Sequence, residues 1–434
     1  MMTKDTGALY QKLVEDQEQL FHGIPQDPEW KKIRLSAWED FRKLGFPTTR
    51  HEDWRYTNIL PFLQTPYQIA GKNGVHLNAS SVDGLDLPGL DAWRIVLVNG
   101  VLHQELCRLP QEGPLRVLPL EEAAALPEFR KHFSRYIDTA NNHFAALNTA
   151  FASTGLFLEL GTMATASKPV HLLHLTTGSS PLLIQYRNLV VLQPQSSLTL
   201  VEHFVPLYLS GDVLVNSATE MVLCEGATAD HFRIQNGNQH EATVNHTQVF
   251  QDASTRYNNH TFCLNGKFIR NNTHVTIGAS GGESHLYGLY ITGGDQLVDN
   301  HTFVDHRKPG SQSNEWYKGV MKDRSAGVFS GKIFVRPGAQ KTNAFQQNNN
   351  ILIGENATMN SKPELEIFAD DVKCSHGSTT GQLDEEAAFY LRTRGIGQQT
   401  ARSMLVHAFA YDLTEKIRLE PLKRYINNLI DEKI

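Results

Sequence analysis

Between residues 155 and 383 the chain carries many short apolar or alternating segments, and this pattern constrains the fold more than any other feature. The segments are a few residues long, as in FLEL, VHLLHL, NLVVL and EMVLC, and clusters of Gly, Ser, Asn and Pro separate them. No helical period lasts long enough to connect parallel strands through a helix. We therefore expect an all-β region, as a sandwich, a barrel or a β-solenoid.

An internal repeat favours the solenoid. Asn-His-Thr occurs at residues 245–247, 259–261 and 300–302, and a permuted Asn-Thr-His occurs at 272–274. The sites that start at 245, 259 and 272 are 14 and 13 residues apart, which suits one side of a flattened coil. Solenoids stack equivalent residues of successive coils above each other. Because the period is imperfect, a sandwich remains the alternative.

The composition changes on both sides of this region, which predicts three units. We expect a mixed, mainly helical N-terminal domain at residues 1–154, a β-core at 155–383 and a helical C-terminal domain at 384–434.

Several elements of the two flanks can be predicted from local signals. Asn99-Gly100 is a strong two-residue turn signal and predicts a hairpin at Ile95–Leu102. Asp384 is a suitable N-cap for a helix that ends before Gly395, and Pro421 suits the start of a terminal helix. Apolar stripes predict further helices over residues 30–44 (Trp30, Ile33, Ala37, Phe41, Leu44), 129–151 (Phe133, Ile137, Phe144, Leu147, Phe151) and 398–416 (Ala401, Leu405, Ala408, Leu413).

Charge and composition narrow the classes of partner and location. The net charge of −6 disfavours nucleic acid as a partner, because phosphate binding usually needs a basic face. No apolar run is long enough to span a membrane, and the first 19 residues lack the apolar stretch of a signal peptide. The four cysteines form no C-x-x-C pair, so neither a zinc knuckle nor a disulfide framework is indicated. We expect a cytoplasmic protein that does not bind a membrane.

The sequence contains neither a G-x-x-x-x-G-K-[ST] phosphate loop nor a G-x-G-x-x-G turn at the start of a helix. Any nucleotide-driven step should therefore come from a partner protein. Eight of the 19 histidines lie between His231 and His306, which could indicate a metal site. Their spacing follows the repeat and not a ligand motif, so we expect His246, His260 and His301 to be structural and hydrogen-bonded.

A sharper candidate site is the segment Asp370–Gly377, which contains Cys374 and His376. If this segment is a strand, the two side chains project from the same face. A thiolate and an imidazole together form a partial site for iron, since soft sulfur ligands suit iron–sulfur chemistry. The alternative is a buried structural cysteine beside a hydrogen-bonded histidine. Two ligands cannot close a cluster site, so a partner chain would have to supply the rest.

Three segments resemble the SufB/SufD family of iron–sulfur cluster assembly proteins. They are RHEDWRYTNI at 50–59, KPELEIFADDVKCSHGSTTGQLDEEAAFYLRTRGI at 362–396 and AFAYDLTEKI at 408–417. The resemblance extends from about Phe46 to Arg418 and is weaker between the two ends. It implies a right-handed parallel β-helix flanked by helical domains, and a non-catalytic scaffold.

Within the family, the chain resembles the SufD members more than the SufB members. SufB proteins carry a cysteine before the segment that matches Ile351–Gly354, and a glutamate directly after the shared histidine. Here Gln346 and Gln347 precede that segment, and Gly377 follows His376. The resemblance implies that His376 and Cys374 take part in building a cluster at an interface with SufB.

The resemblance also implies partners and cofactors. SufB would pair with the chain through the β-helix, and the SufC ATPase would dock on the C-terminal helices, for which we expect the residues Asp384, Phe389, Arg394, Leu405 and Phe409 to matter. We expect no permanently bound cofactor, a transient iron–sulfur cluster in the complex, and a possible flavin there. A homodimer is conceivable for the isolated chain. The alternatives are a SufB-like homodimeric scaffold and a β-solenoid enzyme acting on carbohydrates, since such enzymes also use β-helices.

Overall fold

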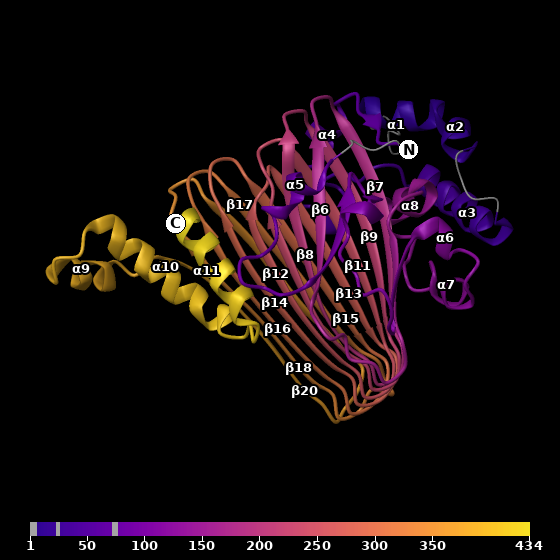
Figure 1. Cartoon of the computed structure of the whole chain (residues 1–434). Helices are drawn as coiled ribbons and strands as arrows, with labels where there is room; N and C mark the ends of the chain where they lie inside the picture. Colours follow the sequence, from indigo (N-terminus) through magenta and orange to yellow (C-terminus); the bar gives the residue numbers. More distant parts are fainter. Residues whose placement is uncertain (1–6, 23–26, 72–76) are drawn as a thin grey trace.

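Two long β-sheets face each other and form a flattened β-solenoid (Figure 1). The computed structural model describes residues 7–22, 27–71 and 77–434. Residues 1–6 of the N-terminal segment inspected for a signal-peptide pattern lie outside the described part. From β5 onward, consecutive strands alternate between the sheets, and neighbours within each sheet are parallel. The predicted β-solenoid is confirmed, and the sandwich alternative is wrong.

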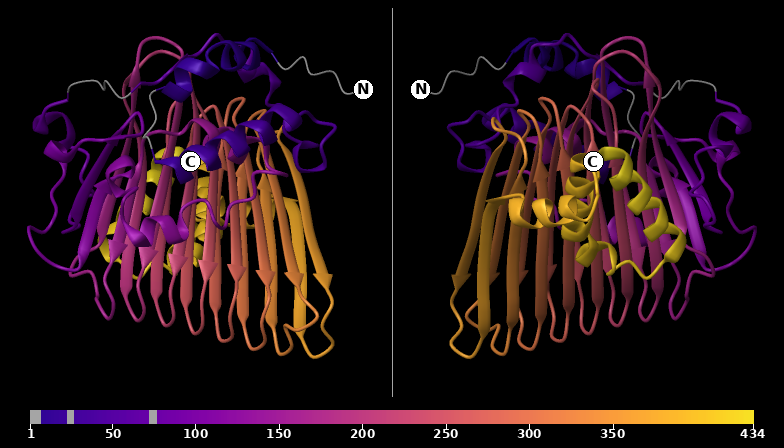
Figure 2. Two further views of the ribbon diagram at one scale, coloured as in Figure 1. Left: turned by 90° about the vertical axis from the view of Figure 1, so that its right-hand side faces the viewer. Right: turned by 90° about the vertical axis from the view of Figure 1, so that its left-hand side faces the viewer.

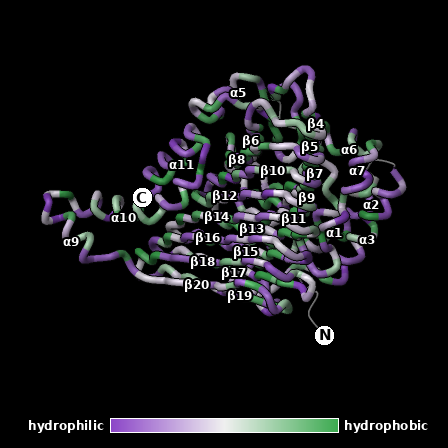
Figure 3. Tube along the Cα trace, turned by 90° about the horizontal axis from the view of Figure 1, so that it is seen from below, coloured by the Kyte–Doolittle hydropathy of each residue, from purple (hydrophilic) through white to green (hydrophobic). Residues whose placement is uncertain are grey.

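One sheet contains the odd-numbered strands except β3, together with β4, and we call it the odd sheet (Figure 3). The other contains the even-numbered strands except β4, together with β3, and we call it the even sheet. The odd sheet has the order β19-β17-β15-β13-β11-β9-β7-β5-β4, with β1 beside β7. Its strands are β1 (Gln68–Ile69), β4 (Leu115–Pro119), β5 (Leu156–Leu160), β7 (Leu182–Leu192), β9 (Val213–Leu223), β11 (Glu241–Gln251), β13 (Phe268–Ile277), β15 (Leu297–His306), β17 (Ala326–Val335) and β19 (Thr358–Ile367). The even sheet has the order β20-β18-β16-β14-β12-β10-β8-β6-β2-β3. Its strands are β2 (Trp93–Val98), β3 (Val101–Leu102), β6 (Val170–Gly178), β8 (Ser197–Leu209), β10 (Thr228–Asn236), β12 (Arg256–Asn265), β14 (Glu283–Thr292), β16 (Gln312–Met321), β18 (Asn343–Leu352) and β20 (Lys373–Gln382).

The triplets at 245–247 and 300–302 lie at equivalent positions two coils apart. Asn245 is in register with Asn271, and Asn271 is in register with Asn300, on β11, β13 and β15. Asn259 lies on β12 in the opposite sheet, which explains why the spacing of about 14 residues covers half a coil. The predicted stacking is confirmed, with Asn271, the residue before the permuted triplet, taking the middle position.

The sheets begin before residue 155. β2 pairs with β6, and β4 pairs antiparallel with β5. The predicted hairpin is confirmed, since β2 and β3 are antiparallel and connected by Asn99 and Gly100. Both turn residues have positive φ, 48° and 84°, which is what a type I′ turn requires.

Most of the N-terminal helices cover the outer face of the odd sheet, whereas α5 (Ala79–Asp83) packs on the even sheet through Val82 (Figures 1 and 3). Phe41, Phe144 and Leu147 of these helices pack against Leu214 and Val244 of β9 and β11 in one apolar cluster. The predicted helix at 30–44 is confirmed by α3. The helices are α1 (Gly7–Glu15), α2 (Gln17–His22), α3 (Pro28–Leu44), α4 (Leu60–Leu63), α5 (Ala79–Asp83), α6 (Leu120–Ala123), α7 (Pro127–His132) and α8 (His143–Phe151), with 3-10 turns at Glu52–Trp54 and Gln104–Leu106.

The single helix predicted over residues 129–151 is wrong, because the structure has α7 and α8 with an irregular segment between them. Glu220 of β9 causes the break. Its carboxylate accepts hydrogen bonds from the backbone N–H of Ser134 at 2.7 Å and of Tyr136 at 3.2 Å. Asn142 then caps α8 by accepting from the backbone N–H of Ala145.

C-terminal helices α9 (Glu385–Thr393), α10 (Gln398–Thr414) and α11 (Glu420–Lys433) follow β20. Asp384 caps α9 as predicted, since its carboxylate accepts from the backbone N–H of Ala387. α10 and α11 pack on the outer face of the even sheet, whereas α9 extends away from the solenoid (Figures 1 and 2). The predicted inner face of α10 is partly wrong: Ala408 is exposed, and Val406 and Ala410 are buried instead. Within residues 7–22, 27–71 and 77–434, none of the helices combines the length and the hydrophobicity that a membrane crossing requires.

Candidate site at the open end of the solenoid

The last coil, formed by β19 and β20, leaves one end of the solenoid open. β19 pairs with β17 and β20 with β18, and within the described part of the chain neither has a strand on its other side (Figure 2). In β18, inward residues are buried and alternate with partly exposed ones, but in β20 every residue except Cys374 is exposed. Such an end presents unpaired backbone groups and an uncovered interior, which native solenoids cap or pair.

Cys374 and His376 lie on β20 and face the space between the two sheets. Ser378, the next residue on the same face, donates a hydrogen bond to the hydroxyl of Ser361 on β19 at 2.7 Å, across that space. Cys374 is half-buried against an apolar cluster that includes Ile333 and Ala344. The prediction that Cys374 and His376 share one face is therefore confirmed.

The environments of these two side chains differ. Burial raises the pKa of the Cys374 thiol, and a hydrogen bond with the backbone of Ala344 opposes this only in part. Cys374 is thus a thiol at neutral pH in the isolated chain. The imidazole of His376 is exposed and makes no side-chain hydrogen bond or ion pair with any described residue. Both of its ring nitrogens remain available to a ligand.

The geometry offers two candidate ligands for iron. Among the residues that the structure describes, no group of three or more His, Cys, Asp or Glu side chains is arranged to hold a metal ion. Cys374 and His376 offer one sulfur and one nitrogen, which suit iron, but a cluster needs further ligands.

The predicted docking residues on the C-terminal helices separate into two groups. Leu405 and Phe409 of α10 pack partly against the apolar cluster on the even sheet. The ammonium of Lys318 donates a hydrogen bond to the backbone carbonyl of Phe409 at 2.8 Å. In contrast, Phe389 is 65% exposed, and Arg394 is exposed on the C-terminal side of α9.

Further exposed apolar side chains accompany Phe389. Tyr390, Met404 and Tyr411 are 56%, 45% and 52% exposed. Sequence analysis did not single out these three residues, although their apolar character within polar helices was a usable signal. Together with Phe389 they form what we call the α9–α10 surface, since all four lie on these two helices.

The three β-region histidines predicted to be structural and hydrogen-bonded all lie on strands of the solenoid, and two of them have a polar partner. The Nε2 atom of His301 lies 2.9 Å from Oδ1 of Asp299. His246 lies 3.3 Å from the amide of Asn142 through its Nδ1 atom. His260 instead stacks between Phe232 and Tyr287, and its Nδ1 atom has no hydrogen-bond partner among the described residues, so the predicted hydrogen bond is wrong there.

The N-terminal motif at residues 50–59 attaches the N-terminal region to the solenoid. The guanidinium of Arg270 on β13 lies 3.9 Å from the centre of the Trp54 ring and donates to the backbone carbonyl of Asp53 at 2.8 Å. Thr57 donates to the carboxylate of Asp299 at 2.6 Å, and Arg270 pairs with the same carboxylate. These contacts explain the motif without any role in the chemistry at β20.

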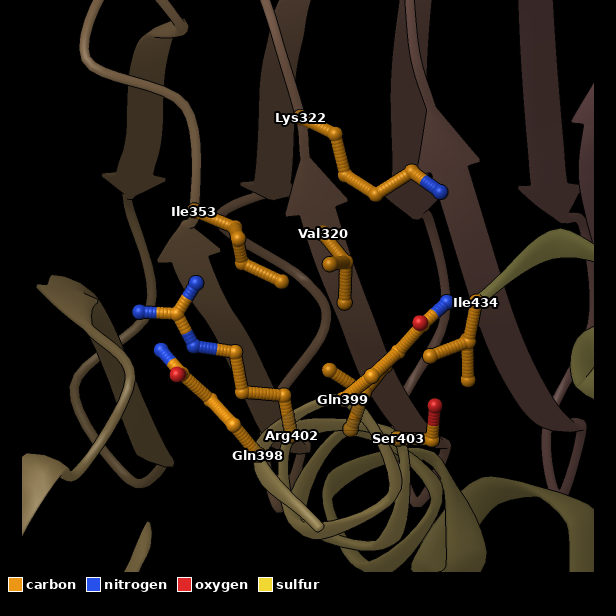
Figure 4. Close-up of a pocket in the computed structure, with 9 residues that line it drawn as sticks. Val320, Lys322, Ile353, Gln398, Gln399, Arg402, Ser403 and Ile434 are labelled. Atoms are coloured by element: carbon orange, nitrogen blue, oxygen red, sulfur yellow. The ribbon is translucent and has the colours of Figure 1, made fainter.

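A cavity of about 380 Å³ lies between the N-terminal part of α10, the even sheet and the chain end (Figure 4). Val320, Lys322 and Ile353 line one side, and Arg402 and Val406 of α10 line the other. Its lining contains neither Cys374 nor His376 and has no cysteine or histidine at all. This cavity is therefore separate from the candidate iron site.

Two family models match the chain. One, described as "SUF system FeS cluster assembly, SufBD core domain", matches residues 174–409, and the other, described as "SufBD protein N-terminal region", matches residues 5–172. Three curated relatives are similar over most of their length. The iron–sulfur cluster assembly protein SufD of Escherichia coli strain K12 is 30% identical over 90% of both chains. The SufD protein of Bacillus subtilis is 24% identical over 98% of this chain and 99% of its own. The chloroplastic protein ABCI7 of Arabidopsis thaliana is 32% identical over 89% of this chain and 82% of its own.

Proposed function

Because this chain belongs to the SufBD family of iron–sulfur cluster assembly proteins, we propose that it is the SufD-type, non-catalytic scaffold subunit of a complex with a SufB-type subunit and the SufC ATPase. The single observation that carries this proposal is the open end of the solenoid, where Cys374 and His376 form an incomplete iron site. Family membership also favours a scaffold over a carbohydrate-acting solenoid enzyme.

The SufB-type partner covers this open end. A strand of the partner that pairs with β20 would satisfy the free backbone groups of its outer edge, as edge strands require. The same contact would bring the partner's cysteine ligands to Cys374 and His376. Pairing through the open end therefore explains both the exposed edge and the missing ligands. In the absence of that partner, a second copy of this chain could occupy the same edge and form a homodimer.

The cluster is cargo in this scheme, held only while it is assembled. His376 contributes a nitrogen ligand, or orients the thiolate of the partner, and Cys374 gives an additional sulfur. No resident cofactor is required, and a flavin would belong to the assembled complex. We also propose a cytoplasmic location, which suits four free thiols.

The SufC ATPase docks on the α9–α10 surface. This surface exposes Phe389, Tyr390, Met404 and Tyr411 on two helices, and α9 projects away from the solenoid (Figure 1). Several large apolar side chains exposed on two adjacent helices favour a protein interaction site there. Asp384 and Arg394 support the shape of α9, Asp384 as its N-cap and Arg394 through stacking on Tyr390.

Phe389→Asp tests the docking surface more cleanly than shortening the chain does. A chain that ends at Leu383 should fail to hold the ATPase, but it would also uncover the apolar cluster that α10 and α11 bury on the even sheet. Phe389→Asp alters an exposed side chain and should abolish co-purification of the ATPase while the melting temperature is unchanged. Leu35→Asp, on an exposed position of α3, is the matched control. Equal ATPase recovery from both variants would contradict the assignment.

The cluster function is tested with His376→Ala in the complex co-expressed with SufB and SufC. Because the side chain is exposed and makes no side-chain hydrogen bond to a described residue, the complex should form normally. Iron and sulfide content should fall to near zero. His240→Ala, a partly exposed histidine paired with Asp212, is the control and should retain both. Full iron and sulfide content in an intact His376→Ala complex would refute the proposed role. Cys374→Ser should have a milder effect, because the partner can still supply sulfur.

A further inference from the structure

Polar side chains that face the interior of the solenoid form hydrogen bonds along the stack of coils. On the odd sheet, Ser217 donates to Asn245 at 2.6 Å, Asn245 to Asn271 at 3.1 Å, and Asn271 to Asn300 at 3.1 Å. Each of these pairs occupies the same register on neighbouring strands. In these three pairs, inward polar groups of register neighbours bond directly to each other, which a strand separation of about 4.8 Å allows.

A second ladder lies on the even sheet and ends at the candidate iron site. Glu315 of β16 is in register with Gln346 of β18, and Gln346 is in register with His376 of β20. The amide Nε2 of Gln346 donates to Oε1 of Glu315 at 3.2 Å, and both side chains are buried. The first two members of this ladder are thus connected, as on the odd sheet.

The carbonyl end of Gln346 is left without a partner. Its Oε1 atom is buried and accepts no hydrogen bond from any described residue. A buried acceptor without a donor costs about 1–3 kcal/mol, so such an atom calls for an explanation. The amide occupies the space that Gly331 leaves by lacking a side chain, since a Cβ atom there would lie 2.4 Å from Nε2. Its next register neighbour is His376, whose imidazole also lacks a partner.

We infer that Gln346, itself oriented by Glu315, positions the imidazole of His376 by accepting the N–H of one ring nitrogen. This inference rests on the proposed function, in which a partner closes the open end. Closure removes His376 from solvent and turns its N–H onto Oε1 of Gln346. The other ring nitrogen then carries the lone pair and faces the cluster.

The chemistry of histidine ligands explains why such a contact is needed. A neutral imidazole has one N–H and one lone pair, and the hydrogen bond at one nitrogen decides which nitrogen can bind metal. Histidines that bind metal almost always donate their other N–H to a carboxylate or a carbonyl. Gln346 and Glu315 are positioning residues in this sense, since neither reaches the iron itself. A glutamine at this position thus has a use of its own, beyond marking the absence of a cysteine.

A structure of the complex with the SufB-type partner tests the contact directly and needs no variant. The distance between Oε1 of Gln346 and the nearer ring nitrogen of His376 should be about 3.2 Å or less. A separation beyond about 4 Å in the closed complex would overturn the inference.

A matched pair of variants tests the consequence. Gln346→Met removes the acceptor at nearly constant size, and Gln347→Met makes the same change at the next residue of β18, which is exposed on the opposite face. Loss of the contact should reduce iron and sulfide in the purified complex about tenfold, the usual lower bound for removing such a partner. Gln347→Met should retain both, and Glu315→Gln should retain most, because Gln346 keeps an acceptor to donate to.

The failures of the two proposals can be told apart. If His376→Ala keeps its cluster, the proposed function fails. If His376→Ala loses the cluster but Gln346→Met keeps it, only the positioning role fails. If Gln346→Met prevents assembly of the complex, the distance between Oε1 of Gln346 and His376 in the unaltered complex decides whether the positioning role holds.

Discussion

Asp299→Asn should loosen the attachment of the N-terminal region to the solenoid. The Asp299 carboxylate is fully buried and accepts from Thr57, pairs with Arg270 and lies beside His301. The substitution keeps the size of the side chain but removes its charge. Arg270, also buried, would then have no counterion.

The expected loss of stability follows from the pKa of the Asp299 carboxylate and from the burial of Arg270. Burial alone would raise the pKa of Asp299, but Arg270, His301 and Thr57 outweigh it and lower the pKa from 3.8 to about 2. The decrease of this pKa from 3.8 to about 2 corresponds to about 2.5 kcal/mol of unfolding free energy when the carboxylate is ionised. Because the change also leaves the Arg270 cation buried without a counterion, we expect a total loss of about 3–5 kcal/mol in unfolding free energy at pH 7.

The pH dependence has a defined sign. Because the pKa is lower in the folded state, the contribution is complete above about pH 4 and is lost as the pH falls towards 2. The difference in unfolding free energy between the unaltered chain and Asp299→Asn should therefore narrow on acidification. Between pH 7 and pH 3 it should decrease by about 1 kcal/mol.

Urea denaturation over this pH range measures the difference, and hydrogen exchange at residues 50–59 locates it. Urea is preferable to guanidinium chloride, which screens ion pairs. Asp295→Asn is the control, since Asp295 forms an exposed pair with Arg324 and should leave the midpoint unchanged. Equal midpoints for the two variants, or a difference that widens at pH 3, would refute this reasoning.

Three further predictions follow from buried or half-buried groups. Glu220→Gln should lower the free energy of unfolding by about 3–5 kcal/mol, because the Arg187 cation that Glu220 pairs with is also buried. Hydrogen exchange of the backbone amides at 133–142 should accelerate, and unchanged protection there would contradict the anchoring role of Glu220. Arg34→Met should raise the free energy of unfolding by at least about 1 kcal/mol. The reason is that burial lowers the pKa of Arg34 to about 9 and that both terminal nitrogens of its side chain lack partners among the described residues. A lower melting temperature would show that the hydrogen bond from Arg34 to the Ala150 carbonyl matters more. Cys374 should react with iodoacetamide at pH 8 more slowly in the folded chain than in urea, because its pKa is raised, and equal rates would contradict this.

Local signals in the sequence determined the elements whose cause is local. Alternation and the Asn-His-Thr rhythm predicted the solenoid, because every coil must place like residues in the same register. Asn99-Gly100 and Asp384 predicted a turn and a cap, since each acts within three residues of itself. The face shared by Cys374 and His376 followed from strand alternation alone.

Tertiary structure decided whatever depends on partners far along the chain. Glu220 interrupts the helix predicted over 129–151 from more than 80 residues away, and no local pattern records such a contact. The inner face of α10 depends on which side meets the even sheet, so Val406 is buried in place of Ala408. In the sequence, Gln346 was notable only for the cysteine it replaces. Its buried, unpartnered carbonyl beside His376 exists because parallel pairing brings residues 30 positions apart into register at an end that remains open.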